Sequence, residues 1–327
     1  MITFLTSAKP FSGRNRKNQI RAIQSWLSVT SEVEVIVYGE AEGANDVCDN
    51  LGIHYVPDIN ATESGLPYFN SIVEHAQEKA IYDTQVYVNC DILLNASLLR
   101  AIQCIPFSEY LLIGQRVDLD NDIYINPSLN GWFNVLLSEV SKKHVRLHGP
   151  SGKDYFVFHR GMWERLPPVI IGRGAYDSAL LAHCLRSHIP IIDGTYAIVA
   201  LHQFHDYAHV SGGLEEVRKG AAAALNRQGS KVLHSAPTVG DSQWELHDGE
   251  LLRNAYRGDW LRALEMHWRF HKKREFLSLV IRALWRILTA TKIYKPNNAV
   301  LSNVLDAWSA QSSCHSNSKD IDESSSI

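Results

Sequence analysis

Hydrophobic positions in the first 120 residues follow two alternating spacings. Short runs rich in β-branched residues, such as VEVIVYG at 33–39, are typical of strands buried on both faces. Between these runs, apolar residues recur every three or four positions, as in a helix. The predicted strands are residues 2–6, 33–39, 54–57, 85–89 and 110–114, and the predicted helices are 18–28, 44–51, 67–80 and 97–105. This alternation predicts βαβ units, so we expect an α/β fold with a mostly parallel sheet flanked by helices.

The alternation loosens after residue 120. Further strands are predicted at 154–158, 189–193 and 197–201, with a helix at 177–187. We expect four parts: a catalytic domain at 1–211, a Gly- and Ala-rich linker that covers the active site at 212–250, a basic helical segment at 251–300, and a disordered Ser-rich tail at 301–327.

Composition narrows the class of protein. A chain of 327 residues with 45% hydrophobic content can bury a large core, and a net charge of −3 argues against chain-wide attraction to nucleic acid. Five cysteines without CxxC pairs predict reduced thiols rather than a disulfide framework or a cysteine zinc site. The apolar run near the first residue is too short for a signal peptide, so we expect a cytoplasmic protein.

Two side-chain oxygens stand at the end of the predicted strand 85–89, within YVNCDILL. Asn89 and Asp91 are two residues apart, which places them on one face of an extended chain. Ligands of open α/β sheets bind at the carboxyl ends of strands, and Mg²⁺ or Mn²⁺ on a nucleotide diphosphate takes carboxylate oxygens. We therefore predict that Asp91 is a metal ligand. The alternative is a strand-end Asp that caps the following turn.

A second acidic residue opens a predicted helix in IGRGAYDSALL. Asp177 stands there, where the helix dipole and free N–H groups keep a carboxylate ionised. It is a candidate general base that takes the proton of an acceptor hydroxyl, or a simple N-cap.

Three histidines follow the predicted strand 197–201 in LHQFHDYAH. Neutral imidazoles at His202, His205 and His209 could bind a metal ion or contact a diphosphate. A surface histidine cluster and a zinc site are alternatives, although no HExxH motif or cysteine partner accompanies them. Upstream, HGPSGKDYFVF brings His148, Ser151, Lys153 and Asp154 through a tight turn, which is either a substrate-binding loop or an ordinary hairpin turn.

Seven segments, taken in order, resemble glycosyltransferase family 2-like, GT-A-fold nucleotide-diphospho-sugar transferases over residues 1–227. They are ITFLTSAKPF, EVIVYGE, LPYFNSIVEHAQ, YVNCDILL, HGPSGKDYFVF, GRGAYDSALL and HQFHDYAH. The resemblance implies a GT-A (Rossmann-like) sheet with a helical C-terminal appendage, a DxD-type metal site at 89–91, and an acidic base at Asp177. Asn89 departs from the pattern, because it replaces the first Asp of DxD.

The resemblance also implies roles for single residues. Glu40, after the second strand, matches the nucleoside contact, and Lys219 in RKGAAAALNRQG matches a diphosphate contact. The predicted donor-binding residues are Thr6, Glu40, Asn89, Asp91, Lys153 and Lys219. The predicted ligands of Mn²⁺ or Mg²⁺ are Asp91, His202 and His205.

The segment 251–296 mixes aromatic and basic residues. It holds eleven Lys and Arg against three acidic residues, Asp259, Glu265 and Glu275. A basic aromatic helix of this kind suits an anionic membrane surface, and peripheral contact with the inner membrane face is one prediction. The alternative is a helical appendage whose aromatic residues pack on the catalytic domain.

The expected function is sugar transfer from a nucleotide-sugar donor to a hydroxyl of a glycan or lipid-linked acceptor, with no nucleic-acid partner. A single base at Asp177 suits direct displacement, so we expect inversion. Two alternatives remain: a non-catalytic nucleotide-sugar-binding protein, and a sugar-nucleotide pyrophosphorylase. The latter is disfavoured because TSAKPFSGRNRKN has one glycine where such an enzyme needs a Gly-rich loop.

Overall fold

The computed structural model describes residues 1–120, 123, 125–127, 129, 131–140, 145–204, 212–230, 236–254, 260–271, 274–291 and 299–322. Residues 139–140, 271 and 312–322 are described by their backbone alone.

A nine-stranded sheet forms the centre of the molecule, in the order β13-β12-β10-β6-β9-β4-β1-β2-β3. Its strands are β1 (Ile2–Ser7), β2 (Val33–Tyr38), β3 (His54–Val56), β4 (Thr84–Val88), β6 (Leu111–Ile113), β9 (Tyr155–His159), β10 (Ile191–Asp193), β12 (Trp244–His247) and β13 (Glu250–Arg253). Neighbouring strands are parallel except where β9 runs against β4 and β6, and where β13 pairs with β12. The predicted α/β fold with a mostly parallel sheet is confirmed.

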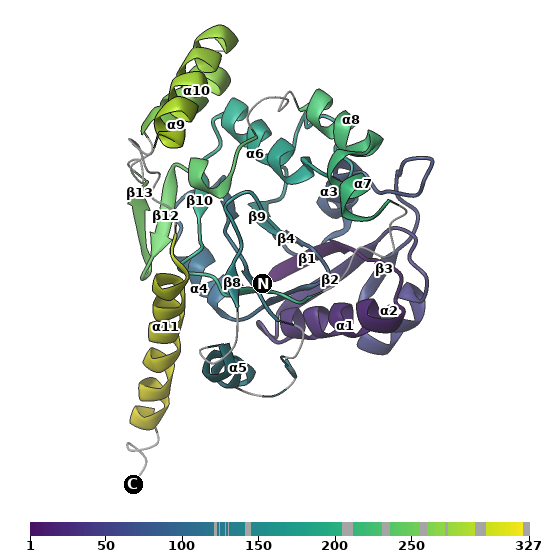
Figure 1. Ribbon diagram of the computed structural model, residues 1–327. Helices are drawn as coiled ribbons and strands as arrows, with labels where there is room; N and C mark the ends of the chain where they lie inside the picture. Colours follow the sequence, from purple (N-terminus) through teal and green to yellow (C-terminus); the bar gives the residue numbers. More distant parts are fainter. Residues whose placement is uncertain are drawn as a thin grey trace.

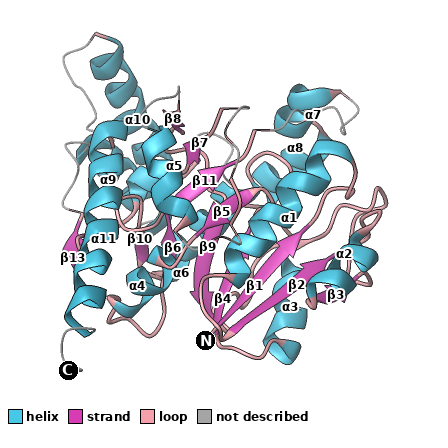
Figure 2. Cartoon of the chain, turned by 90° about the horizontal axis from the view of Figure 1, so that it is seen from below, coloured by secondary structure: helices cyan, strands magenta, loops and turns pink. Residues whose placement is uncertain are grey.

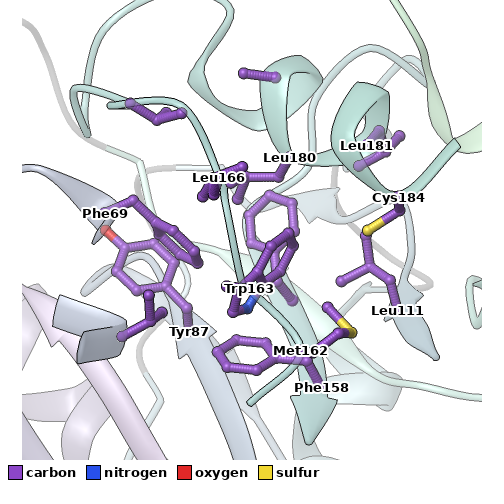
Figure 3. Close-up of a cluster of buried hydrophobic side chains, with 14 of the residues drawn as sticks. Phe69, Tyr87, Leu111, Phe158, Met162, Trp163, Leu166, Leu180, Leu181 and Cys184 are labelled. Carbon is purple, nitrogen blue, oxygen red and sulfur yellow. The ribbon is translucent and has the colours of Figure 1, made fainter. Parts of the chain in front are cut away.

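Helices cover both faces of this sheet (Figure 1, Figure 2). Buried side chains of α3 (Phe69–Lys79) and α6 (Tyr176–Ser187) form one core with the sheet. Figure 3 shows part of this core, where Phe69, Tyr87, Phe158 and Trp163 meet edge to face. The second core lies under α1 (Gly13–Leu27), α2 (Ala44–Leu51) and α4 (Ser97–Gln103).

A second sheet of four short strands lies beside the first, in the order β5-β11-β7-β8. Its strands are β5 (Ile92–Leu94), β11 (Ala200–His202), β7 (Val117–Asp118) and β8 (Arg146–Leu147). In its register His202 stands beside Asp118 on one side and Ile92 on the other. This small sheet therefore brings β11, which overlaps the strand predicted at 197–201, close to residue 91. Helix α5 (Trp132–Val140) follows β7 in the chain.

The segment 212–250, predicted as a linker that covers the active site, is folded where the structure describes it. Helices α7 (Gly213–Lys219) and α8 (Ala221–Gly229) are followed by a short 3-10 turn, η1 (Val239–Asp241), and by β12, which joins the main sheet beside β10. Asn226 of α8 is fully enclosed and exchanges hydrogen bonds with the backbone of Ile170. Sheet pairing and buried polar contacts make this segment part of the folded domain.

The segment 301–327, predicted as a disordered Ser-rich tail, is helical over residues 301–322. Helix α11 (Leu301–Asp322) buries Val304 and Trp308 completely, and the Trp308 indole donates to the Thr195 carbonyl at 3.1 Å. Two apolar anchors four residues apart hold one turn of this helix on the domain. Residues 323–327 lie outside the described part of the chain.

The basic segment forms three helical pieces: α9 (Trp260–Met266), a π-helical turn η2 (His267–His271) and α10 (Glu275–Ala290). Arg262 anchors them, because its guanidinium binds Asp241 and Glu265. Within the described part of the chain, no helix combines the length and apolarity that crossing a membrane requires.

Candidate active site

A cavity of about 470 Å³ opens at one edge of the main sheet. The strands β1, β2, β4 and β6 run in the same direction, so their carboxyl ends meet at this edge, and antiparallel β9 starts there. Each of these four strands is followed by a charged residue that lines the cavity: Lys9 after β1, Glu40 after β2, Asp91 after β4 and Arg116 after β6. Asp154, just before β9, also lines it. The chain thus gathers charged side chains from distant segments at the place where α/β sheets bind ligands.

Asp91 lies between a lysine and a histidine. Its Oδ2 is 2.9 Å from the Lys9 ammonium, and its Oδ1 is 3.9 Å from Nε2 of His202. The Asp91 carboxylate is largely buried, with 11% of its side chain exposed. The backbone carbonyl of Asp91 accepts from the Gln203 amide, which ties β11 to the end of β4.

Asp118 orients the histidine. Its carboxylate lies 3.2 Å from Nδ1 of His202 and 2.9 Å from Nδ1 of His148, and accepts from Arg116 Nε at 2.9 Å. Burial alone would raise the pKa of Asp118, but the hydrogen bonds from His148, His202 and Arg116 outweigh it and hold this pKa well below its usual range. An ionised Asp118 accepts a hydrogen bond from Nδ1–H of His202, and in that tautomer the Nε2 lone pair faces Asp91.

Asn89 lines the cavity, and both ends of its side-chain amide are hydrogen-bonded to neighbouring side chains. Its amide donates to Asp154 Oδ1 at 2.7 Å, and its oxygen accepts from the Tyr176 hydroxyl at 2.9 Å. Asp154 also binds the Arg116 guanidinium. Burial raises the pKa of Tyr176 well above its usual value, so this hydroxyl stays a donor. The amide of Asn89 is therefore matched to a carboxylate that an aspartate in the same place would repel.

Asp177 stands at the start of α6 on the cavity wall. One oxygen accepts from the Ser178 amide at 2.7 Å, and the other lies 3.1 Å from the Lys153 ammonium. The Lys153 side chain is fully enclosed and also donates to the Ser178 hydroxyl and the Pro237 carbonyl. Lys153 thus lines the cavity, yet its charge is directed at Asp177.

The remaining walls come from loops. Tyr38, Gly39 and Glu40 continue β2 along one side, and Leu66 and Pro67 border them. The loop 171–175 closes another side and brings Arg173, whose guanidinium donates to the Gly172 carbonyl. Glu40, predicted to contact a nucleoside, therefore lies on the cavity wall.

The side chains of the cavity could bind a divalent cation together with a phosphate group. In the part of the chain that the structure describes, no group of three His, Cys, Asp or Glu side chains could hold a metal ion alone. Asp91 Oδ1 and His202 Nε2 lie 3.9 Å apart and could supply two ligands, and Mg²⁺ or Mn²⁺ often takes the others from phosphates and water. The cavity wall carries Lys9, Arg116, Lys153 and Arg173 against Glu40, Asp91, Asp154 and Asp177. The side chains of Lys, Arg, Asp and Glu on this wall therefore carry no net charge at pH 7.

Three predicted residues do not join this group. Thr6 is fully buried, and its hydroxyl donates to the Val88 carbonyl at 2.7 Å, so it connects β1 to β4 beneath the cavity. Lys219 ends α7 on the surface, paired with Glu215 at 3.0 Å, and does not line the cavity. His205, like His209, lies outside the described residues.

Several residues at the site were not selected from the sequence. Lys9 and Arg116 follow the carboxyl ends of β1 and β6, so the rule that identified Asp91 also applies to them. Asp118 gave no such signal, because its approach to His202 depends on the pairing of very short strands.

No protein-family model matches the chain, nor does any curated protein sequence. Three solved structures illustrate its similarities. Residues 1–349 of S. aureus TarS in complex with UDP-GlcNAc match with 16% identity and a TM-score of 0.29, over 38% of this chain and 36% of that one. The mannosyltransferase PcManGT from Pyrobaculum calidifontis, in complex with GDP-Man and Mn²⁺, matches with 16% identity and a TM-score of 0.40 over 62% and 56%. M. tuberculosis glucosyl-3-phosphoglycerate synthase matches with 12% identity and a TM-score of 0.43 over 73% and 82%. The chain thus spans little more than a third of the TarS chain that it matches.

Proposed function

We propose that the protein is a glycosyltransferase that uses a nucleotide-sugar and a divalent cation. One observation carries the proposal: Asp91 and His202, with facing ligand atoms 3.9 Å apart, line the same cavity as the helix-start carboxylate of Asp177. Such a transfer needs two parts: a pair of ligands for the metal ion that neutralises the leaving diphosphate, and a base for the acceptor hydroxyl.

The donor lies, in this proposal, with its diphosphate near Asp91 and its nucleoside toward Glu40. Asp91 Oδ1 and His202 Nε2 would hold Mn²⁺ or Mg²⁺, which would supply positive charge for the leaving group. Asp118 keeps the His202 imidazole in the required tautomer through the 3.2 Å contact to Nδ1. Arg173 and Lys9 are the cations of the wall that are placed to bind phosphate oxygens.

Asp177 serves as the general base. An acceptor hydroxyl oxygen forms a bond to the anomeric carbon, the bond from that carbon to the diphosphate oxygen breaks, and the hydroxyl proton passes to the carboxylate. The Ser178 amide and Lys153 occupy two of about four lone-pair sites of the carboxylate, so it retains acceptor capacity. A single base and direct displacement give inversion. The acceptor is a hydroxyl of a glycan or of a lipid-linked glycan.

A second candidate function is nucleotide-sugar binding without transfer. The observation that favours it is that both working carboxylates contact lysines, Asp91 with Lys9 at 2.9 Å and Asp177 with Lys153 at 3.1 Å. If these pairs persist when donor is bound, the base is too well stabilised to accept a proton.

The decisive experiment is a thermal shift with UDP and GDP and their linked sugars, with and without Mn²⁺. Ligand at about a hundred times its Kd adds about 2.7 kcal/mol, or a Tm rise of about 5 °C, and we expect this only with the metal. Asp91→Asn should abolish the rise, while Asp248→Asn, a surface substitution in the β12–β13 turn with a side chain 63% exposed, should not. Indifference to every nucleotide, with or without Mn²⁺, would refute the donor assignment.

Release of nucleoside diphosphate then separates the two candidates. With a mixed glycan acceptor pool, the transferase releases diphosphate and Asp177→Asn stops the release while keeping the thermal shift. A thermal shift without release for the unsubstituted protein supports the binding protein instead.

A further inference from the structure

Helix α10 has one face on the protein and one face in solvent. It packs against α9 and η2, with Ser278 and Ile281 buried at this contact. Figure 1 shows it at the periphery, outside the layers of helices that cover the main sheet. Its position leaves the opposite face uncovered by the described chain.

The uncovered face is apolar. Phe276 is 80% exposed and Ile287 61%, and between them Leu279, Val280 and Leu284 are each 45–49% exposed. These positions are spaced by three, four, eight and eleven residues from Phe276, so they form one stripe along the helix. The adjoining α9 exposes Trp260 and Leu264 as well. A contiguous apolar patch of this kind on a soluble domain indicates an interaction site.

The excess of basic residues in the segment that contains α10 favours an anionic partner. The segment 251–296 holds eleven Lys and Arg against three acidic residues, while the rest of the chain holds 21 against 32. Arg262 does not add to the surface charge, because it forms buried ion pairs with Asp241 and Glu265. On α10, however, Arg286 is exposed beside the apolar stripe and Arg282 is half-buried next to it. An apolar stripe with arginines at its border, on an otherwise acidic chain, fits an anionic layer with an apolar interior.

We propose that α10 lies flat on an anionic phospholipid surface, with Phe276 and Ile287 inserted among the acyl chains and Arg286 at the headgroups. The helix has 16 residues, or about 24 Å of length, which is short of the hydrocarbon thickness. A second copy of the chain fits less well, because two α10 faces packed together would bring arginines of like charge to the same contact. The inference is independent of the donor, since lipid binding requires no nucleotide.

The test is co-sedimentation of the full-length protein with vesicles. One set contains equal parts of phosphatidylcholine and phosphatidylglycerol, and the other contains phosphatidylcholine alone. We expect binding to the first set, weakened by salt, and little binding to the second. Phe276→Ser should weaken binding about tenfold, since one large apolar side chain no longer leaves water. Arg286→Glu should weaken it about thirtyfold, because two units of charge change at the headgroups.

Ile81→Ser is the matched control. Ile81 is 64% exposed but lies before β4, far along the chain from α10, so its loss should leave vesicle binding unchanged. Because Phe276 is mostly in solvent, its substitution should also preserve the Tm of the protein. No binding to anionic vesicles, or an equal loss with Ile81→Ser, would overturn the proposal. So would sedimentation velocity showing a lipid-free dimer that Phe276→Ser converts to a monomer, since the stripe would then bind a second copy.

Discussion

Asn89→Asp restores the DxD pattern of the family that the sequence resembles, and sequence pattern alone predicts a stronger metal site. The structure predicts the opposite outcome. The Asn89 amide donates to Asp154 at 2.7 Å, so an aspartate here would place two carboxylates in contact. Asp154 is 8% exposed, and solvent relieves little of the repulsion.

The size of the effect follows from three magnitudes. A lost hydrogen bond to a charged group costs about 1.5–3 kcal/mol. Two unit charges about 4 Å apart repel by about 4 kcal/mol at an effective dielectric constant of about 20. Protonation of the new carboxyl limits the total, because holding it neutral at pH 7 costs about 4 kcal/mol from an ordinary pKa of about 3.9. Arg116 binds Asp154 and offsets part of the repulsion. We therefore expect a loss of about 2–4 kcal/mol at pH 7.

Urea denaturation at two pH values measures this loss. The pKa of the introduced carboxyl is raised in the folded state, so the free energy of unfolding falls as pH rises above about 3.9, the value in the unfolded chain. The variant should approach the stability of the parent protein near pH 4 and lose most at pH 7. Asn89→Ala, which removes the hydrogen bond without adding charge, should show no such pH dependence. Equal stability of Asn89→Asp and the parent at pH 7 would refute the role assigned to Asp154.

Three further outcomes are expected. Trp308→Ala should lower the free energy of unfolding, measured in urea, by about 3–5 kcal/mol. A loss under about 1 kcal/mol would show that Trp308 does not pack α11 on the core. Gly152→Ala should reduce the Mn²⁺-dependent thermal shift, because its Cβ would lie 2.4 Å from the His148 ring, whereas Gly149→Ala meets nothing within 4 Å and serves as the control. Asp118→Asn should flatten the fall of Tm below about pH 4, since a carboxylate with a depressed pKa stabilises the fold above that pH and loses this contribution as pH falls; parallel Tm curves would contradict it.

The sequence predicted the first half of the fold well, because burial on both faces leaves a strong pattern. Strand β2 buries five of its six residues in succession. Strand β12 gave no such signal, since Leu246 is its one fully buried residue. Helix α11 was hidden for a similar reason, because Val304 and Trp308 are its apolar anchors within a Ser-rich stretch. A short element held by one or two side chains is determined by its neighbours in space and not by its own periodicity.

The sequence likewise predicted some residues of the candidate site and missed others. Asp91 and Glu40 follow strands of the main sheet, so a rule about strand ends is enough to bring them to one edge. The orientation of His202 by Asp118 has a different origin, since it depends on the register of β11 with β7, where each strand has only two or three residues. Such pairings leave no hydrophobic pattern to detect.

Charge balance connects the two lysines of the cavity to the proposed chemistry. Lys9 contacts Asp91 from a strand end and has 28% of its side chain exposed, whereas the Lys153 side chain is completely enclosed by Asp177, Ser178 and the Pro237 carbonyl. The Lys9 side chain keeps part of its contact with solvent, whereas the Lys153 ammonium is itself enclosed and would become an unpaired buried charge if Asp177 were lost. Under the proposed function, Lys9 is therefore the better candidate to exchange Asp91 for an incoming phosphate, and Lys153 the better candidate to stay and hold the Asp177 carboxylate.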